Sequence, residues 1–193
     1  MPVNLPLLLT WLRIIAIPLF VAVLYFPEEW ISASGANIVS TAIFIGAAVT
    51  DWADGYLARR WNQTTRFGAF LDPVADKLMV TAALIVLAEK GLVDPFVALI
   101  IIGREITISA LREWMAQVGH AGSVAVNVLG KLKTITQLVA IPFLLFDGEL
   151  LGVFHTNPVG RVLIWVAAIL TLWSMVVYLR AAVVSARSSS DGR

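Results

Sequence analysis

Residues 51–77 read DWADGYLARRWNQTTRFGAFLDPVADK, and the charged residues of this stretch stand out in an otherwise mostly apolar chain. It holds four aspartates within 26 residues of a chain in which 59% of the residues are hydrophobic. Ionised carboxylates beside hydrocarbon are costly unless they bind something, so charged residues in apolar segments indicate a functional site. The four aspartates are Asp51, Asp54, Asp72 and Asp76.

The spacing within this stretch predicts two helical faces joined by a loop over about residues 60–66. Intervals of three and four residues place side chains on one face of a helix. The first face would carry Asp51, Asp54, Gly55 and Ala58, and the second would carry Gly68, Asp72 and Asp76. We expect the two faces to meet around a shared ligand.

The residue types indicate a hard divalent cation as part of that ligand. The chain has no cysteine and its two histidines lie far from the stretch, which disfavours zinc and favours Mg²⁺ or Mn²⁺. Two such ions about 3.5–4 Å apart can stabilise both the attacking and the leaving oxygen of a displacement at phosphorus. We therefore expect two ions, with Arg59 contacting the negative charge of the substrate.

A structural role would account for part of this pattern. Asp72 precedes Pro73 and could cap a helix that begins there, and Asp51 could cap or end another helix. Capping explains one or two of the carboxylates. It leaves the set of four unexplained.

Composition indicates an integral membrane protein. Only 14% of the 193 residues are charged, and the mean hydropathy of +0.86 is too high for a soluble domain of this length. The net charge of +1 gives no reason to expect a nucleic-acid partner. The first apolar run lacks a basic leader and a cleavage site, so we expect it to be retained as a helix.

Six segments are long and apolar enough to span a bilayer, which takes about 20 residues. They are residues 5–26, 36–60, 68–88, 92–117, 126–146 and 159–182. The expected fold is an all-α bundle of six transmembrane helices, forming one domain over residues 1–185 with a polar, disordered tail over 186–193.

Basic residues predict the orientation of this bundle. If both termini face the cytoplasm, the outer loops hold Lys90 and Arg161, and the other twelve of the 14 Lys and Arg residues lie on the inner side. Such a bias is the positive-inside pattern. The aspartates at the inner ends of the second and third segments would then open to the cytoplasm.

The whole pattern from Asp51 to Asp76 is D-x2-D-G-x2-A-R-x8-G-x3-D-x3-D. At every fixed position it resembles the signature of the CDP-alcohol phosphatidyltransferase family. The residues that fill the pattern, together with IGREITISALREWMA, SVAVNVLGKLKT and LTLWSM, are similar to a bacterial branch of that family. The resemblance covers about residues 4–178.

The resemblance implies a reaction and a set of roles. The donor would be CDP-diacylglycerol and the acceptor sn-glycerol 3-phosphate, giving phosphatidylglycerol phosphate and CMP. All four aspartates would ligate the metal ions, and Asp76 would also take the proton from the attacking hydroxyl, whereas the residue pattern alone supports only its ligand role. The residues implied to bind CDP-diacylglycerol are Gly55, Ala58, Arg59, Thr65, Gly68 and Asn4. A homodimer in the bacterial inner membrane is also implied.

Basic residues further along the chain predict a region that binds the phosphate of the acceptor. They are Arg104, Arg112, Lys131 and Arg180. As an alternative, such residues contact lipid headgroups or neutralise acidic neighbours, and headgroup contact explains Lys133 equally well. Tyr178 is interpreted as an interfacial or packing residue.

Two other functions stay open on the residues alone. The same chemistry could use another alcohol, such as inositol phosphate or serine, because the basic residues favour a phosphorylated acceptor without naming it. A divalent-cation transporter would also place aspartates in membrane segments. It would leave Gly55, Arg59 and Gly68 without a role, and the carboxylates cluster at helix ends instead of at mid-bilayer.

Overall fold

The computed structural model describes residues 5–61, 66–117, 128–150 and 152–190. In this part of the chain there are six α-helices and one short hairpin. The helices are α1 (Leu5–Leu24), α2 (Ala33–Trp61), α3 (Arg66–Glu89), α4 (Pro95–Gln117), α5 (Val128–Phe146) and α6 (Thr156–Ser190). The hairpin pairs β1 (Glu149–Leu150) antiparallel with β2 (Phe154–His155).

Each of the six apolar segments expected from the sequence overlaps one helix. Two helical stretches, Ala33–Asp51 in α2 and Thr156–Arg180 in α6, are long and apolar enough to cross a membrane, and Leu8–Leu24 and Leu132–Phe146 are shorter apolar stretches. The hairpin is not predicted by the sequence. Helix α6 continues to Ser190, so it extends into the polar tail that is expected to begin at residue 186.

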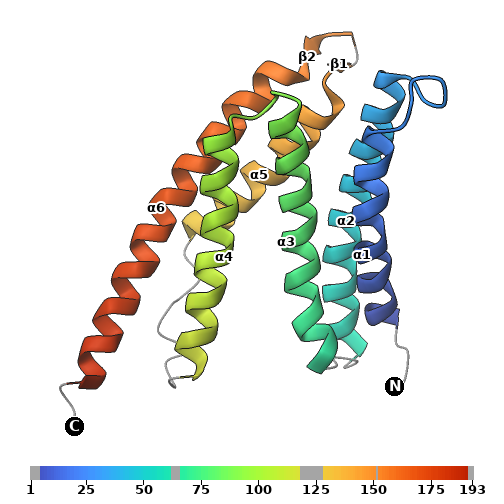
Figure 1. The fold of residues 1–193 in the computed structure, drawn as a ribbon. Helices are drawn as coiled ribbons and strands as arrows, with labels where there is room; N and C mark the ends of the chain where they lie inside the picture. The colour runs from blue at the N-terminus through green and yellow to red at the C-terminus, as the bar shows by residue number, and fades with distance from the viewer. Residues whose placement is uncertain (1–4, 62–65, 118–127, 151, 191–193) are drawn as a thin grey trace.

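The helices run side by side, and α5 crosses obliquely behind α3 (Figure 1). Helix α1 packs on α2 and α3, while α6 packs on α5 and α4. Helix α1 begins and α6 ends at the same end of the bundle, and the hairpin lies at the opposite end. Alternating helix directions therefore bring the end of α2 and the beginning of α3, which carry the aspartates, to the end where α1 begins.

One apolar core holds the bundle together, and it draws on all six helices. Its largest buried side chains are Phe20, Phe44, Leu84, Leu87, Ile101, Ile141, Leu144 and Ile164. The outer surface is also apolar: Phe96 is 75% exposed and Trp173 is 64% exposed. Such extensive exposed apolar surface is rare on soluble monomers and is typical of helices that face lipid.

Candidate active site

Helix α1 contacts two of the four aspartates. Arg13 forms an ion pair with Asp51 of α2, in which Nη1 donates a hydrogen bond to Oδ1. Thr10 Oγ1 donates a hydrogen bond of 2.6 Å to Oδ1 of Asp72 in α3. Thr10 and Arg13 are one helical turn apart, and they are 1% and 3% exposed. Since both are buried in a packed interface, α1 fixes the orientation of both carboxylates.

Neither of these aspartates is a helix cap. Helix α3 begins at Arg66 and continues through Pro73, so Asp72 lies within the helix rather than before it. Helix α2 continues from Asp51 to Trp61. The capping explanation is therefore wrong for both residues, and their carboxylates are available for another role.

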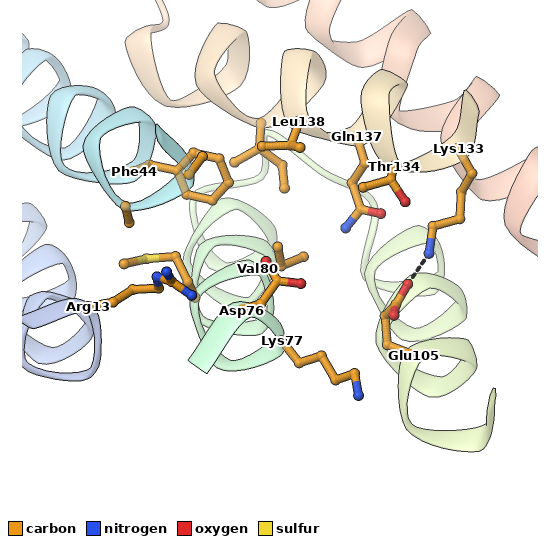
Figure 2. Close-up of a pocket in the computed structure, with 14 residues that line it drawn as sticks. Arg13, Phe44, Asp76, Lys77, Val80, Glu105, Lys133, Thr134, Gln137 and Leu138 are labelled. Atoms are coloured by element: carbon orange, nitrogen blue, oxygen red, sulfur yellow. Dashed lines mark hydrogen bonds and ion pairs between the residues drawn. The ribbon is translucent and has the colours of Figure 1, made fainter. Parts of the chain in front are cut away.

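A cavity of about 80 Å³ lies beside Asp76, between α1, α2, α3, α4 and α5. It has room for several water molecules. Figure 2 shows Arg13 and Asp76 on one side of this cavity and Glu105 and Lys133 on the other. Its polar lining residues are Arg13, Asp76, Lys77, Glu105, Lys133, Thr134 and Gln137. The cavity therefore places a carboxylate and a buried ammonium group on opposite walls.

Glu105 joins two buried cations at the far wall of this cavity. Its Oε1 accepts a hydrogen bond from Nζ of Lys133 and lies 3.4 Å from Nη1 of Arg104. Lys133 is 3% exposed and Arg104 is 6% exposed. Buried charges require a partner, and one carboxylate shared by two cations leaves a net positive charge here.

Arg104 and Arg112 meet at Tyr178 of α6. Their guanidinium carbons lie 5.7 and 5.3 Å from the centre of the tyrosine ring, within the range of cation–π attraction. Nη2 of Arg112 donates a hydrogen bond of 3.2 Å to the Tyr178 hydroxyl, and Nη2 of Arg104 donates one of 3.1 Å to Oγ of Ser174. Two of the basic residues predicted from the sequence to bind the acceptor phosphate are thus brought together by one aromatic side chain.

Other predicted site residues are described in part or not at all. Gly68 is buried in the first turn of α3. Asn4 and Thr65 lie outside the described residues. For some predicted residues the structure describes the helix backbone and not the side chain: Asp54, Gly55, Ala58 and Arg59 in α2, and Lys131 in α5.

Arg180 lies apart from the other predicted basic residues. It is exposed and lines an apolar groove on α6 with Ile169, Trp173 and Val177. Within the described part of the chain, Arg180 makes no hydrogen bond or ring contact with Arg104 or Arg112. The structure thus brings together two of the four basic residues expected at the acceptor phosphate, and it does not bring Arg180 to them.

Sequence reasoning missed Glu105, Gln137 and Tyr178 as site residues. One signal could have identified Tyr178: Thr171, Ser174 and Tyr178 are polar residues at intervals of three and four in a mostly apolar helix. Such a stripe marks a face that packs against polar groups of other helices.

The oxygen donors present here fit a hard divalent cation in their chemistry. Asp51, Asp72 and Asp76 come from two adjacent helices, and α1 holds two of them by side-chain contacts. Among the described side chains, which exclude that of Asp54, no group of three or more Asp, Glu, His or Cys residues is close enough to hold one ion. A metal role for these residues is therefore part of the proposal below.

Comparison with known proteins identifies the same family that the sequence motif resembles. Residues 3–173 match the family described as CDP-alcohol phosphatidyltransferase. The chain is 51% identical to the CDP-diacylglycerol–glycerol-3-phosphate 3-phosphatidyltransferases of Salmonella typhimurium and Shigella flexneri, and 50% identical to that of Escherichia coli. Each alignment spans 184 residues, which is 94% of this chain and 96% of the relative.

Proposed function

The chain belongs to the CDP-alcohol phosphatidyltransferase family, and we propose that it transfers the phosphatidyl group of CDP-diacylglycerol to sn-glycerol 3-phosphate. Relatives that are 50–51% identical over nearly the whole chain are named for this reaction. Every fixed residue of the family signature is present between Asp51 and Asp76. The products are phosphatidylglycerol phosphate and CMP.

The proposed setting is the inner membrane of a bacterial cell, with all six helices spanning it. Support comes from helix length: α3 has 24 residues and α4 has 23, and a span takes about 20. The end where α1 begins and α6 ends would face the cytoplasm, because most Lys and Arg residues lie toward it. The aspartates would then open to the side where glycerol 3-phosphate and Mg²⁺ are found.

Two divalent cations, Mg²⁺ or Mn²⁺, are proposed to be held by Asp51, Asp54, Asp72 and Asp76. When bound, such ions would neutralise the pyrophosphate of the donor and the charge that develops on the departing CMP. Thr10 and Arg13 hold Asp72 and Asp51 in fixed orientations for that role. Proposed contacts to CDP-diacylglycerol are Gly55, Ala58, Arg59, Gly68, Thr65 and Asn4.

The cavity between Asp76 and Lys133 is the observation that carries the acceptor assignment. Glycerol 3-phosphate has a hydroxyl at one end and a dianionic phosphate at the other. Asp76 would accept the proton of the attacking hydroxyl, while Lys133 and the nearby arginines would bind the phosphate. The hydroxyl oxygen bonds to the phosphorus that carries diacylglycerol, and the bond from that phosphorus to CMP breaks. Catalysis is then mostly positioning and charge neutralisation.

The test is release of CMP by the purified protein in detergent with CDP-diacylglycerol and Mg²⁺. Glycerol 3-phosphate, inositol phosphate and serine are offered separately, and the lipid product is identified by mass spectrometry. We expect rapid release with glycerol 3-phosphate alone, and loss of release when EDTA removes the metal. Faster release with either of the other two alcohols would overturn the acceptor assignment.

A homodimer is proposed from the resemblance to the family. Native mass spectrometry of the detergent-purified protein tests it directly, and a monomeric mass for active protein would contradict it.

A further inference from the structure

Helix α6 carries a buried polar stripe made of Thr171, Ser174 and Tyr178. These side chains belong to residues that are 0%, 1% and 3% exposed, in a helix whose other residues are mostly apolar. The stripe lies on the side of α6 that packs against α4 and α5. Buried polar groups are costly unless they are paired. Ser174 and Tyr178 find partners on α4, whereas the Thr171 hydroxyl has no hydrogen-bond partner among the described residues.

Those partners are the arginines of α4. Ser174 accepts a hydrogen bond from Arg104 and donates one of 3.0 Å to the backbone oxygen of Thr171, which fixes the direction of its hydroxyl. Tyr178 accepts a hydrogen bond from Arg112 and presents its ring to both guanidinium groups. Arg104 and Arg112 are eight residues apart, and Tyr178 bridges the two helical turns between them.

The first turn of α5 also approaches the Tyr178 hydroxyl. A Cβ atom added to Gly130 would lie 3.9 Å from that oxygen. Lys133 follows Gly130 by three residues, so it lies on the same face of α5, one turn closer to the cavity. Tyr178 therefore stands where α4, α5 and α6 meet, beside the basic cluster of Arg104, Arg112 and Lys133.

The charge of this basic cluster is only partly compensated. In the part of the chain that the structure describes, the carboxylate in contact with it is that of Glu105. A tyrosine attracts guanidinium groups through its ring and hydroxyl without cancelling their charge, whereas a carboxylate would cancel the charge and compete with an incoming phosphate. Nε of Arg104 is buried and has no hydrogen-bond partner among the described residues. A donor is thus left for an anion.

We propose that Tyr178, assisted by Ser174, is a positioning residue for the acceptor substrate. It holds Arg104 and Arg112 in the conformations in which their remaining N–H groups bind the phosphate of glycerol 3-phosphate. Arginine side chains lose much rotamer entropy when they are fixed, and Tyr178 fixes them before the substrate arrives. This inference rests on the proposed function and adds a residue that does not itself touch substrate.

Steady-state kinetics of three variants test this role, and each variant removes a different part of the contact. Tyr178→Phe removes the hydroxyl and keeps the ring, and Tyr178→Leu removes both. Ser174→Ala removes the hydroxyl that accepts a hydrogen bond from Arg104. We expect the KM for glycerol 3-phosphate to rise about 5-fold for Tyr178→Phe, the effect of one lost hydrogen bond, and further for Tyr178→Leu. The KM for CDP-diacylglycerol should stay unchanged. Trp173→Leu, on the exposed face of α6, is the matched control and should change neither KM.

A second readout does not depend on turnover. Inorganic phosphate should raise the thermal unfolding temperature of the wild-type protein. The phosphate concentration needed for half of this effect should be higher for Tyr178→Phe than for the wild type, and higher still for Tyr178→Leu. If Tyr178→Leu fails to fold, Tyr178→Phe and Ser174→Ala decide the matter, because both are small changes: the first removes one hydrogen bond and the second removes two. Equal rises of KM for both substrates would mean a general structural role and would overturn the inference.

Arg112→Ala separates this inference from the proposed function on which it rests. An unchanged KM for glycerol 3-phosphate in Arg112→Ala would refute the acceptor role of the arginine itself. A raised KM in Arg112→Ala with unchanged values in both Tyr178 variants would refute the positioning role alone.

Discussion

The Thr10 hydroxyl donates a hydrogen bond of 2.6 Å to Oδ1 of Asp72, linking α1 to α3 across 62 residues of sequence. One turn later Arg13 makes the equivalent link from α1 to Asp51 of α2. Residues that contact the ligands of a metal orient them and tune their affinity. Helix α1 is therefore part of the proposed metal site without supplying a ligand to it.

Thr10→Val should weaken the binding of divalent metal. Valine keeps the shape of this buried side chain and removes its hydroxyl, so Asp72 loses the contact that orients it. Loss of such a supporting contact typically costs about 10–100-fold in metal affinity or activity. The measurement is activity as a function of Mg²⁺ concentration, with Thr10→Ser as the control that keeps the hydroxyl. An unchanged Mg²⁺ requirement in Thr10→Val would show that this hydrogen bond is only structural.

Arg13→Met should destabilise the protein most when no metal is present. Arg13 is 3% exposed, and its guanidinium pairs with Asp51 and lines the cavity beside Asp76, so its removal takes the ion-pair partner from Asp51 and a neighbouring cation from Asp76. Breaking a fully buried pair costs about 3–5 kcal/mol. Since the Asp51 side chain is 41% exposed, we expect about 1–2 kcal/mol here.

Thermal unfolding in EDTA and in Mg²⁺ measures this difference for Arg13→Met and the wild type. Bound metal would supply the missing positive charge, so Mg²⁺ should recover most of the lost stability. A loss of equal size under both conditions would argue against a metal ion beside Asp51. Arg161→Met, at the exposed beginning of α6, is the control for the loss of a positive charge.

Asp76→Asn should abolish transfer and leave CDP-diacylglycerol binding measurable. Asparagine has nearly the same size as aspartate, so the cavity keeps its shape. Its amide does not accept the proton of the acceptor hydroxyl, and it binds metal more weakly than a carboxylate does. Single-turnover CMP release measures the chemical step, and protection against thermal unfolding by CDP-diacylglycerol measures binding. Substantial turnover in this variant would exclude Asp76 from the chemistry.

The six helices and the location of the aspartates follow from sequence because both depend on local pattern. Apolar segments of about 20 residues predict helices, and three- and four-residue spacing predicts shared faces. That Asp51 and Asp72 are not caps required the structure, since only the continuity of α2 and α3 excludes the alternative. The roles of Asp54 and Arg59 stay predictions, because the structure does not describe their side chains.

The basic residues show where local pattern is insufficient. Successive helical residues are about 100° apart, so Tyr178 and Arg180 point in directions about 200° apart. The sequence alone does not say which of these directions faces α4. Packing decides it: Tyr178 is buried against the arginines, and Arg180 lies in an exposed apolar groove. The pairing of Glu105 with Lys133, 28 residues apart, likewise depends on how α4 and α5 pack.

Lys133→Ala should raise the KM for glycerol 3-phosphate by about 10-fold or more and leave the KM for CDP-diacylglycerol unchanged. Lys133 is the buried cation on the wall of the cavity opposite Asp76, and its loss removes a charge-assisted contact to phosphate. It also leaves Glu105 without its closest cation, which should lower the unfolding temperature.

The double variant Glu105→Gln/Lys133→Ala separates these two effects of Lys133. Removing the carboxylate that has lost Lys133 should restore part of the stability, since Glu105 then has only Arg104 as a cationic partner, while the acceptor KM stays high, because the phosphate still lacks its lysine. Lys131→Ala serves as the comparison, since an acceptor role for Lys131 is predicted from the sequence. If Lys131→Ala raises the acceptor KM and Lys133→Ala does not, the acceptor phosphate binds away from this cavity wall, and the cavity beside Asp76 holds only the hydroxyl end of the substrate.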